Sequence, residues 1–334
     1  MVSVRTDVQT DVQAGRPRLA LGLSRVGVTG VEKVIRIRDD RGEEQLYSAQ
    51  LSCSVDLGAE QKGAHMSRFE EGVNDAIGAV ILGSSAFRAE TLAERIAELV
   101  RDRQGARRAQ VTITARYPEH KPAPVSGIPT QEIYTLHGAA SASEHGTRRV
   151  VGVTASGITA CPCAQGLLQD SARTRLLDDG FDEDEVARIF ARVPVATHNQ
   201  RGLGTLHLGV PEGSDVLFDA RDLLAIVEAS MSSEVYELMK RADEAHVVEK
   251  AHRQPRFVED CVREALGGVL ERYPELPDDT FVSARQENLE TIHQHDVVAE
   301  RVATLGELRA ELAGEVPVAR HASLGAWMDA PASA

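Results

Sequence analysis

The sequence predicts an α+β protein built on antiparallel sheets, and two observations support this. Apolar residues alternate at period 2 in some segments and recur at helical spacing in others. These segments follow the order strand pair, two helices, strand pair, and the order occurs twice. Helices do not separate the strands one by one, and no G-x-G-x-x-G follows a strand, which argues against a doubly wound parallel sheet. We therefore expect two tandem α+β units.

The first unit is expected over residues 18–147. Residues 49–57, "AQLSCSVDL", alternate apolar and polar side chains, as a half-buried strand does. Residues 68–83 and 89–103 place apolar side chains three and four positions apart, which predicts two amphipathic helices. Alternation returns over residues 109–117, which predicts the strand that follows the helices.

The second unit is expected over residues 148–312 and repeats this rhythm. Strands are predicted at 148–160, 203–211 and 281–297, helices at 220–244 and 254–273, and an inserted helical segment at 166–195. The ends of the chain, residues 1–17 and 313–334, contain few large apolar side chains and are expected to form disordered tails.

The composition excludes several classes of protein. The chain has 334 residues, 42% of them hydrophobic, which suffices for a large core. A net charge of -14 argues against binding to nucleic acid or to an anionic membrane. No apolar run is long enough to span a membrane, the N-terminus lacks a secretory signal, and four cysteines are too few for a disulfide scaffold. We expect a cytoplasmic protein with reduced thiols.

Two of the four cysteines lie on either side of a proline in "SGITACPCAQ". Cys161 and Cys163 are too close together for a zinc ribbon half or an unstrained disulfide. Pro162 breaks strand pairing, so a turn is expected where a buried inert thiol has little reason to occur. A functional role is therefore favoured for this pair, whereas Cys53 and Cys261 are expected to be small core residues.

Further groups could complete a metal site or bind an anion. A catalytic metal takes about three protein ligands from Cys, His, Asp or Glu and leaves a position open. The candidates are His198 in "ATHNQRG", Glu244 and His246 in "KRADEAH", and His293 and His295 in "ETIHQHD". Separately, Lys62, His65 and Arg68 precede a predicted helix and could bind phosphate, although a merely basic turn is an equal alternative.

Taken together, these motifs resemble a known family. "KGAHMSRFEE", "SGITACPCAQ", "THNQRG", "EVYELMKRADE", "PRFVEDCVRE" and "ENLETIHQHD" occur in the order found in type IB GTP cyclohydrolases and the related archaeal Fe(II)-dependent enzymes. The resemblance covers about residues 18 to 312. It implies the tunnelling fold, with two units per chain, and a homotetramer with active sites at subunit interfaces.

The resemblance also implies a role for each motif. Cys161, His198 and Glu244 would bind one divalent metal (Zn, Mn or Fe(II)), although Glu234 and Glu237 are alternatives for the third ligand. His293, Glu290 and Cys163 would serve catalysis. The substrate would be bound by Glu259, Lys62, His65, Arg68 and Arg201, with Glu259 at the guanine edge and the first three cations on the triphosphate.

The implied reaction opens the guanine imidazole ring of GTP by hydrolysis, releases formate and recloses the ring. No nucleotide cofactor is implied. The product would be 7,8-dihydroneopterin triphosphate, for folate or pterin synthesis, or, in the archaeal form, the 2′,3′-cyclic phosphate of dihydroneopterin. Two alternatives stay open: a nitrile reductase or pterin synthase of the same fold, and a non-catalytic protein in which Cys-Pro-Cys closes a structural zinc site.

Overall fold

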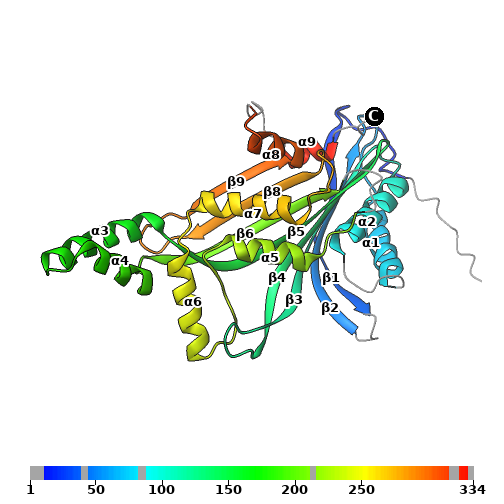
Figure 1. Cartoon of the computed structure of the whole chain (residues 1–334). Helices are drawn as coiled ribbons and strands as arrows, with labels where there is room; N and C mark the ends of the chain where they lie inside the picture. Colours follow the sequence, from blue (N-terminus) through cyan, green and yellow to red (C-terminus); the bar gives the residue numbers. More distant parts are fainter. Residues whose placement is uncertain (1–10, 39–43, 82–87, 211–215, 316–322, 330–334) are drawn as a thin grey trace, which may run out of the picture. The chain divides into compact units, whose positions relative to one another are not determined.

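Figure 1 shows the computed structural model of the chain, which describes residues 11–38, 44–81, 88–210, 216–315 and 323–329. The predicted tails lie partly outside these ranges, at residues 1–10, 316–322 and 330–334. Two compact units form. One takes its residues from Met1–Ala115, Gly138–Arg149 and Met328–Ala334, and the other from Arg116–His137 and Val150–Trp327.

In the first unit, a helix pair accompanies long antiparallel strands. The elements are β1 (Leu23–Arg38), β2 (Glu44–Leu57), α1 (Met66–Ile81), α2 (Ala89–Gln104), the first half of β3 (Ala109–Pro122), the end of β4 (Pro129–Ser143) and the start of β5 (Gly146–Ala160). β2 pairs with both β1 and β3, with Cys53 opposite Val28 on one side and Val111 on the other. Leu51, Ile113 and Ile96 are buried, as the alternating and helical patterns predict.

The second unit continues β3, β4 and β5 and adds most of the helices. Its further elements are α3 (Pro162–Asp178), α4 (Glu183–Arg192), β6 (Asn199–Val210), α5 (Ala220–Ser230), β7 (Ser233–Glu234), α6 (Arg241–Arg253), α7 (Val258–Arg272), β8 (Phe281–Leu289), β9 (Val297–Thr304), α8 (Leu305–Leu312) and α9 (Leu324–Asp329). The strand order is β3-β4-β5-β6-β8-β9, and the short β7 pairs with β5. β6, β8 and β9 are antiparallel neighbours, which confirms the predicted α+β class with antiparallel pairing.

Two helices cover one face of the second unit's strands. α5 packs on β6, and α7 packs on β8 and β9 (Figure 1). The close approach of α5 depends on Gly204, where an added Cβ would lie 2.6 Å from the Val227 side chain. Even-numbered β6 residues such as Leu206 and Leu208 are fully buried beneath these helices. The apolar residues of the alternating pattern therefore lie on the face of the strand that the helices cover.

The single helix expected over residues 220–244 is wrong. The chain leaves helix after Ser230, pairs Ser233 and Glu234 with β5, and resumes helix only at Arg241. The Ser232 hydroxyl accepts a hydrogen bond from the Ala160 N–H at 3.1 Å. Serine is a weak helix former, and pairing with β5 satisfies backbone groups that a continuous helix would use internally.

The segment between Cys161 and His198 forms two helices that leave the sheet. α3 buries none of its residues, and α4 buries only Val186. A capping box begins α4: Asp182 accepts from the Glu185 N–H at 2.8 Å, and the Glu185 carboxylate accepts from the Asp182 N–H at 3.1 Å. Local capping rather than burial therefore stabilises this excursion.

The other two cysteines lie in the core, as predicted. Cys53 is 2% exposed on β2 and Cys261 is 1% exposed on α7. Burial raises the pKa of each thiol to about 12, so both stay protonated and unreactive at neutral pH.

Two histidines face each other on β4 and β6. The rings of His137 and His207 lie 5.3 Å apart, and His137 shares a 2.9 Å hydrogen bond with the hydroxyl of Thr154. Gly152 leaves room for the second ring, since an added Cβ would lie 2.3 Å from it. Burial, and then the neighbouring His137, lower the pKa of His207 to about 4.

This pair predicts an acid-sensitive free energy of unfolding. Because the unfolded chain binds the His207 proton near pH 6.5 and the folded chain only near pH 4, stability should fall as pH decreases through that window. The loss attributable to His207 is about 3 kcal/mol. Urea unfolding at pH 7 and pH 4.5 should show a smaller loss in His207→Gln than in the wild type. The exposed-site control His145→Gln should behave as the wild type, and equal losses in all three proteins would contradict the assignment.

Candidate active site

Cys161 lies at the corner where β5 ends and α3 begins. It is the N-cap residue of α3, and its Sγ accepts a hydrogen bond from the Ala164 N–H at 3.5 Å. Pro162 at the first helical position gives up no hydrogen bond there, because that N–H would have no partner within the helix. The thiol is half-buried, so a metal or another ligand could reach it at this corner.

His198 is held beside Cys161 by the backbone. The Cys161 N–H donates to the His198 carbonyl at 3.1 Å, and the Thr197 hydroxyl donates to the Cys161 carbonyl at 2.9 Å. Gln165 supports the same corner, since its side-chain amide donates to the carbonyls of Val195 and His252, each at 2.7 Å. The structure thus joins the backbones of two of the three predicted metal ligands.

Gln200 orients the His198 imidazole. This buried amide donates from Nε2 to the Thr159 hydroxyl at 3.0 Å and turns Oε1 toward His198 Nδ1 at 3.1 Å. An amide oxygen can only accept, so Nδ1 carries the proton and Nε2 keeps its lone pair. This is the tautomer that a metal-binding histidine requires when a neighbour fixes its other nitrogen.

Glu290 brings a carboxylate to the same imidazole. Its side chain is 7% exposed, and Oε2 lies 3.8 Å from His198 Nδ1. Oε2 is buried and accepts no hydrogen bond from any described residue. The backbone N–H of Glu290 donates to Asp296 at 3.0 Å, which fixes the turn after β8. A buried carboxylate oxygen without a donor is costly unless a cation or a bound molecule completes it.

The three glutamates considered for the third ligand lie in different settings. Glu244 is exposed in the first turn of α6. Glu237 is exposed in the segment before that helix. Glu234 on β7 holds Lys250 at 2.6 Å; burial alone would raise its pKa, but the hydrogen bond and charge of Lys250 lower it. Glu234 is therefore already engaged by a cation.

The neighbouring Asp243, which the sequence analysis did not single out, has a structural role. It is fully buried and accepts hydrogen bonds from the N–H groups of Val125, Ser126 and Lys240, each at 2.8 Å. Burial would raise its pKa, but these bonds and one from the Ser126 hydroxyl hold the pKa well below its usual range. Asp243 thus fixes the start of the helix that carries Glu244.

The remaining predicted catalytic residues are exposed. His293 and His295 lie in the turn between β8 and β9 with their rings stacked 5.2 Å apart. Cys163 is exposed in the first turn of α3. These side chains are therefore accessible to a bound molecule.

The donor set at the corner fits a divalent metal in chemical type. A thiolate, an imidazole nitrogen and carboxylate oxygens suit Zn²⁺ or Fe²⁺. Among the described residues, no three His, Cys, Asp or Glu side chains already lie close enough to form a complete ligand cluster. The fit therefore rests on Cys161, on the orientation of His198 and on the unpartnered oxygen of Glu290.

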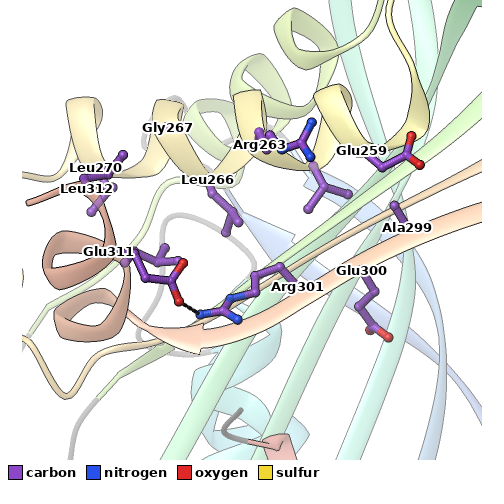
Figure 2. Close-up of a pocket in the computed structure, with 12 residues that line it drawn as sticks. Glu259, Arg263, Leu266, Gly267, Leu270, Ala299, Glu300, Arg301, Glu311 and Leu312 are labelled. Carbon is purple, nitrogen blue, oxygen red and sulfur yellow. Dashed lines mark hydrogen bonds and ion pairs between the residues drawn. The ribbon is translucent and has the colours of Figure 1, made fainter. Parts of the chain in front are cut away.

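Glu259 lines a separate cavity of about 590 Å³ between α7, β9 and α8. Figure 2 shows Glu259 and Ala299 near one end of this cavity and Leu270 and Leu312 near the other, with Arg301 paired to Glu311 between them. The Glu259 carboxylate is exposed at the start of the helix, where it could accept N–H bonds from a ligand.

The predicted cations lie in two places. Lys62, His65 and Arg68 are in the first unit, where His65 lies 3.4 Å from Asp11 and Arg68 donates to the Arg103 carbonyl at 3.1 Å. Lys62 is exposed. Arg201 is in the second unit, on β6, and lines a polar cavity of about 660 Å³.

No motif in the sequence predicts the residues that hold the corner together, chiefly Gln165, Thr197 and Gln200. Each is an uncharged polar residue within five positions of a predicted ligand, and Thr197 and Gln200 are buried. A glutamine two residues after a histidine at the start of a strand lies on the same face, which is the signal that could have identified Gln200.

The fold has a distant relative among solved structures. Uricase from Arthrobacter globiformis aligns with a TM-score of 0.51 over 85% of this chain and 94% of that chain, at 9% identity. At this identity the likeness concerns the fold alone. No helix within the described ranges is long and apolar enough to cross a membrane.

Sequence comparison gives a closer relationship. Residues 9–299 match the family described as "Type I GTP cyclohydrolase folE2". The GTP cyclohydrolase MptA of Methanococcus vannielii is 40% identical over 91% of this chain and 98% of that protein. MptA of Methanocaldococcus jannaschii is 40% identical over 90% of this chain and 97% of that protein. MptA of Methanosarcina barkeri is 39% identical over 90% of this chain and 96% of that protein. Matches of this extent and identity show that the chain belongs to the type I GTP cyclohydrolase (folE2) family.

Proposed function

We propose that this chain is a metal-dependent GTP cyclohydrolase that opens the guanine imidazole ring and releases formate. The observation that carries the proposal is the corner where Cys161 and His198 are joined by a backbone hydrogen bond beside the buried carboxylate of Glu290. Family membership supports the choice of GTP as substrate, since the relatives of the same length are GTP cyclohydrolases.

Cys161, His198 and Glu244 are proposed to hold one divalent metal, with Fe(II), Zn and Mn as candidates. The engagement of Glu234 by Lys250 favours Glu244 over that alternative. When bound, the metal would supply Lewis acidity that lowers the pKa of water. His198 would bind the metal through Nε2, because Nδ1 is hydrogen-bonded to the Gln200 side-chain oxygen.

The other side chains then handle protons and orient the base. Glu290 Oε2, which no described donor occupies, would accept the proton of the water that attacks C8. His293 would give or take a proton at N7 or N9, because imidazole titrates near neutral pH. Glu259 would accept N–H bonds from the guanine edge, Cys163 would contact the reacting base, and Lys62, His65, Arg68 and Arg201 would bind the rest of the substrate.

We also propose the tunnelling fold for the tandem units, a homotetramer with active sites at subunit interfaces, and a cytoplasmic location. The repeated pattern of antiparallel strands and a helix pair supports the fold. A subunit interface would allow residues of the first unit of one copy to meet Cys161 of another.

Two products are possible for this chemistry. The linear product is 7,8-dihydroneopterin triphosphate, for folate or pterin synthesis, and the alternative is the 2′,3′-cyclic phosphate. The near full-length match to MptA proteins is the reason for keeping the cyclic phosphate as the alternative product.

Replacing Cys161 with alanine should remove both metal and activity. The change deletes a proposed ligand at the end of β5 without altering the core. We expect metal content per chain to fall at least tenfold and formate release from GTP to fall by about 10³ or more. Metal analysis and a formate assay on the protein loaded with Fe(II), Mn(II) or Zn(II) measure the two effects.

Cys261→Ala is the matched control, because that thiol is buried in α7 and should affect stability alone. Full formate release by Cys161→Ala would refute its role. A wild type that binds metal tightly but releases no formate with any of the three metals would instead favour the structural zinc alternative.

Replacing Glu290 with glutamine tests the proton acceptor while keeping the shape of the side chain. We expect kcat for formate release to fall about 10²–10⁴-fold, with KM for GTP little changed, because an amide cannot accept the proton. Glu287→Gln is the control, three residues earlier on β8, where the carboxylate pairs with Arg285 at 2.9 Å. Equal kcat values in the two variants would sink the assignment.

The product can be identified by treating it with a phosphomonoesterase. Linear triphosphate should lose all its phosphate and give dihydroneopterin, whereas a cyclic phosphodiester should resist the enzyme until a phosphodiesterase opens it. Mass spectrometry of the treated product distinguishes the two, and we expect the cyclic diester if the likeness to MptA extends to the product.

A further inference from the structure

The polar cavity that includes Arg201 is distinct from the corner around Cys161. It is lined by Arg116, Gln131, Glu132, Ile133, Tyr134, Ser156, Arg201, Glu228, Val235, Tyr236 and Glu237. Side chains alternate along β6, so Arg201 lies on the face opposite His198 and Gln200. Its Cα is about 10 Å along the chain from that of His198. The cavity is therefore near the candidate metal ligands but opens on another side of the strand.

A half-buried polar cluster forms one wall of this cavity. The Lys121 ammonium lies 2.6 Å from Glu228, and the Tyr134 hydroxyl donates to the same carboxylate oxygen at 2.7 Å. Lys121 also lies 4.3 Å from the ring centre of Tyr236. Burial raises the pKa of Tyr236 to about 12 and that of Tyr134 further, so both hydroxyls remain neutral donors.

Of the three carboxylates in the lining, one is neutralised by a cation and a second accepts two hydrogen bonds from uncharged donors. Glu228 is neutralised by Lys121. Glu132 accepts hydrogen bonds from the Thr130 hydroxyl and the Glu237 N–H, each at 2.8 Å. The carboxylate of Glu237 alone faces solvent without such a partner among the described residues.

The two arginines in the lining have no anionic partner among the described residues. Arg116 and Arg201 are exposed, and no hydrogen bond or ion pair from the described ranges engages either guanidinium. In a chain with a net charge of -14, two unpaired arginines in one cavity stand out. A guanidinium presents a planar fork of donors that matches phosphate oxygens.

We propose that this cavity is a phosphate-binding site in which Arg116 and Arg201 bind an oligophosphate. Lys121 and Tyr134 engage Glu228 in the wall of the cavity, and the Tyr134 and Tyr236 rings give it an aromatic side. Arg116 was not among the residues that the sequence indicated. The oligophosphate can be that of GTP, in which case the site rests on the proposed function, or that of a separate phosphorylated ligand.

Inorganic tripolyphosphate is the probe for the site itself. Calorimetric titration of the metal-loaded wild type should show saturable binding, and Arg116→Gln and Arg201→Gln should each weaken it about tenfold or more. Arg188→Gln, on the exposed side of α4, is the matched control and should bind as the wild type. Unchanged binding in both cavity variants, or no binding by a folded wild type, would overturn the proposal.

Formate kinetics with the same variants then identify the source of the phosphate. A rise in KM for GTP of about tenfold, with kcat retained, assigns the site to the substrate. An unchanged KM, together with loss of any tripolyphosphate effect on rate, assigns it to a separate ligand. A wild type that binds tripolyphosphate but releases no formate would refute the proposed function and leave the phosphate site standing.

Discussion

The candidate active site depends on one backbone hydrogen bond, from the Cys161 N–H to the His198 carbonyl. It joins the residue after β5 to the residue before β6, and it brings their backbones together although thirty-six residues lie between them in the sequence. The bond does not act alone, because Thr197 and Gln165 satisfy further backbone groups at the corner. Both proposed ligands thus lie at the ends of strands rather than within a long loop.

The same corner concentrates buried polar groups, which are costly unless each finds a partner. Thr159, Gln200 and His198 form a chain in which every hydrogen bond has a donor and an acceptor. The chain ends at Glu290, whose Oε2 has no donor within the described part of the protein. This unpartnered carboxylate oxygen is the observation on which the proposed role of Glu290 rests.

The sequence predicted the regular elements well because alternation and helical spacing report burial directly. The strands around Cys53 and Val111 and the helix around Cys261 follow those patterns. It failed at residues 231–240, where pairing with β5 overrides a helix-like run of apolar residues. It also could not reveal Gln200 or Arg116, because their importance comes from neighbours on other strands.

The two helices between residues 162 and 192 contribute little to the core. α3 buries no residue, so its removal or extension changes little of the core. It is tied back at its base, where Arg253 donates to the Arg192 carbonyl at 3.0 Å and Gln165 donates to Val195 at 2.7 Å. Because these ties and the β5–β6 pairing both lie at the base, the distance between Cys161 and His198 is independent of what the excursion contains.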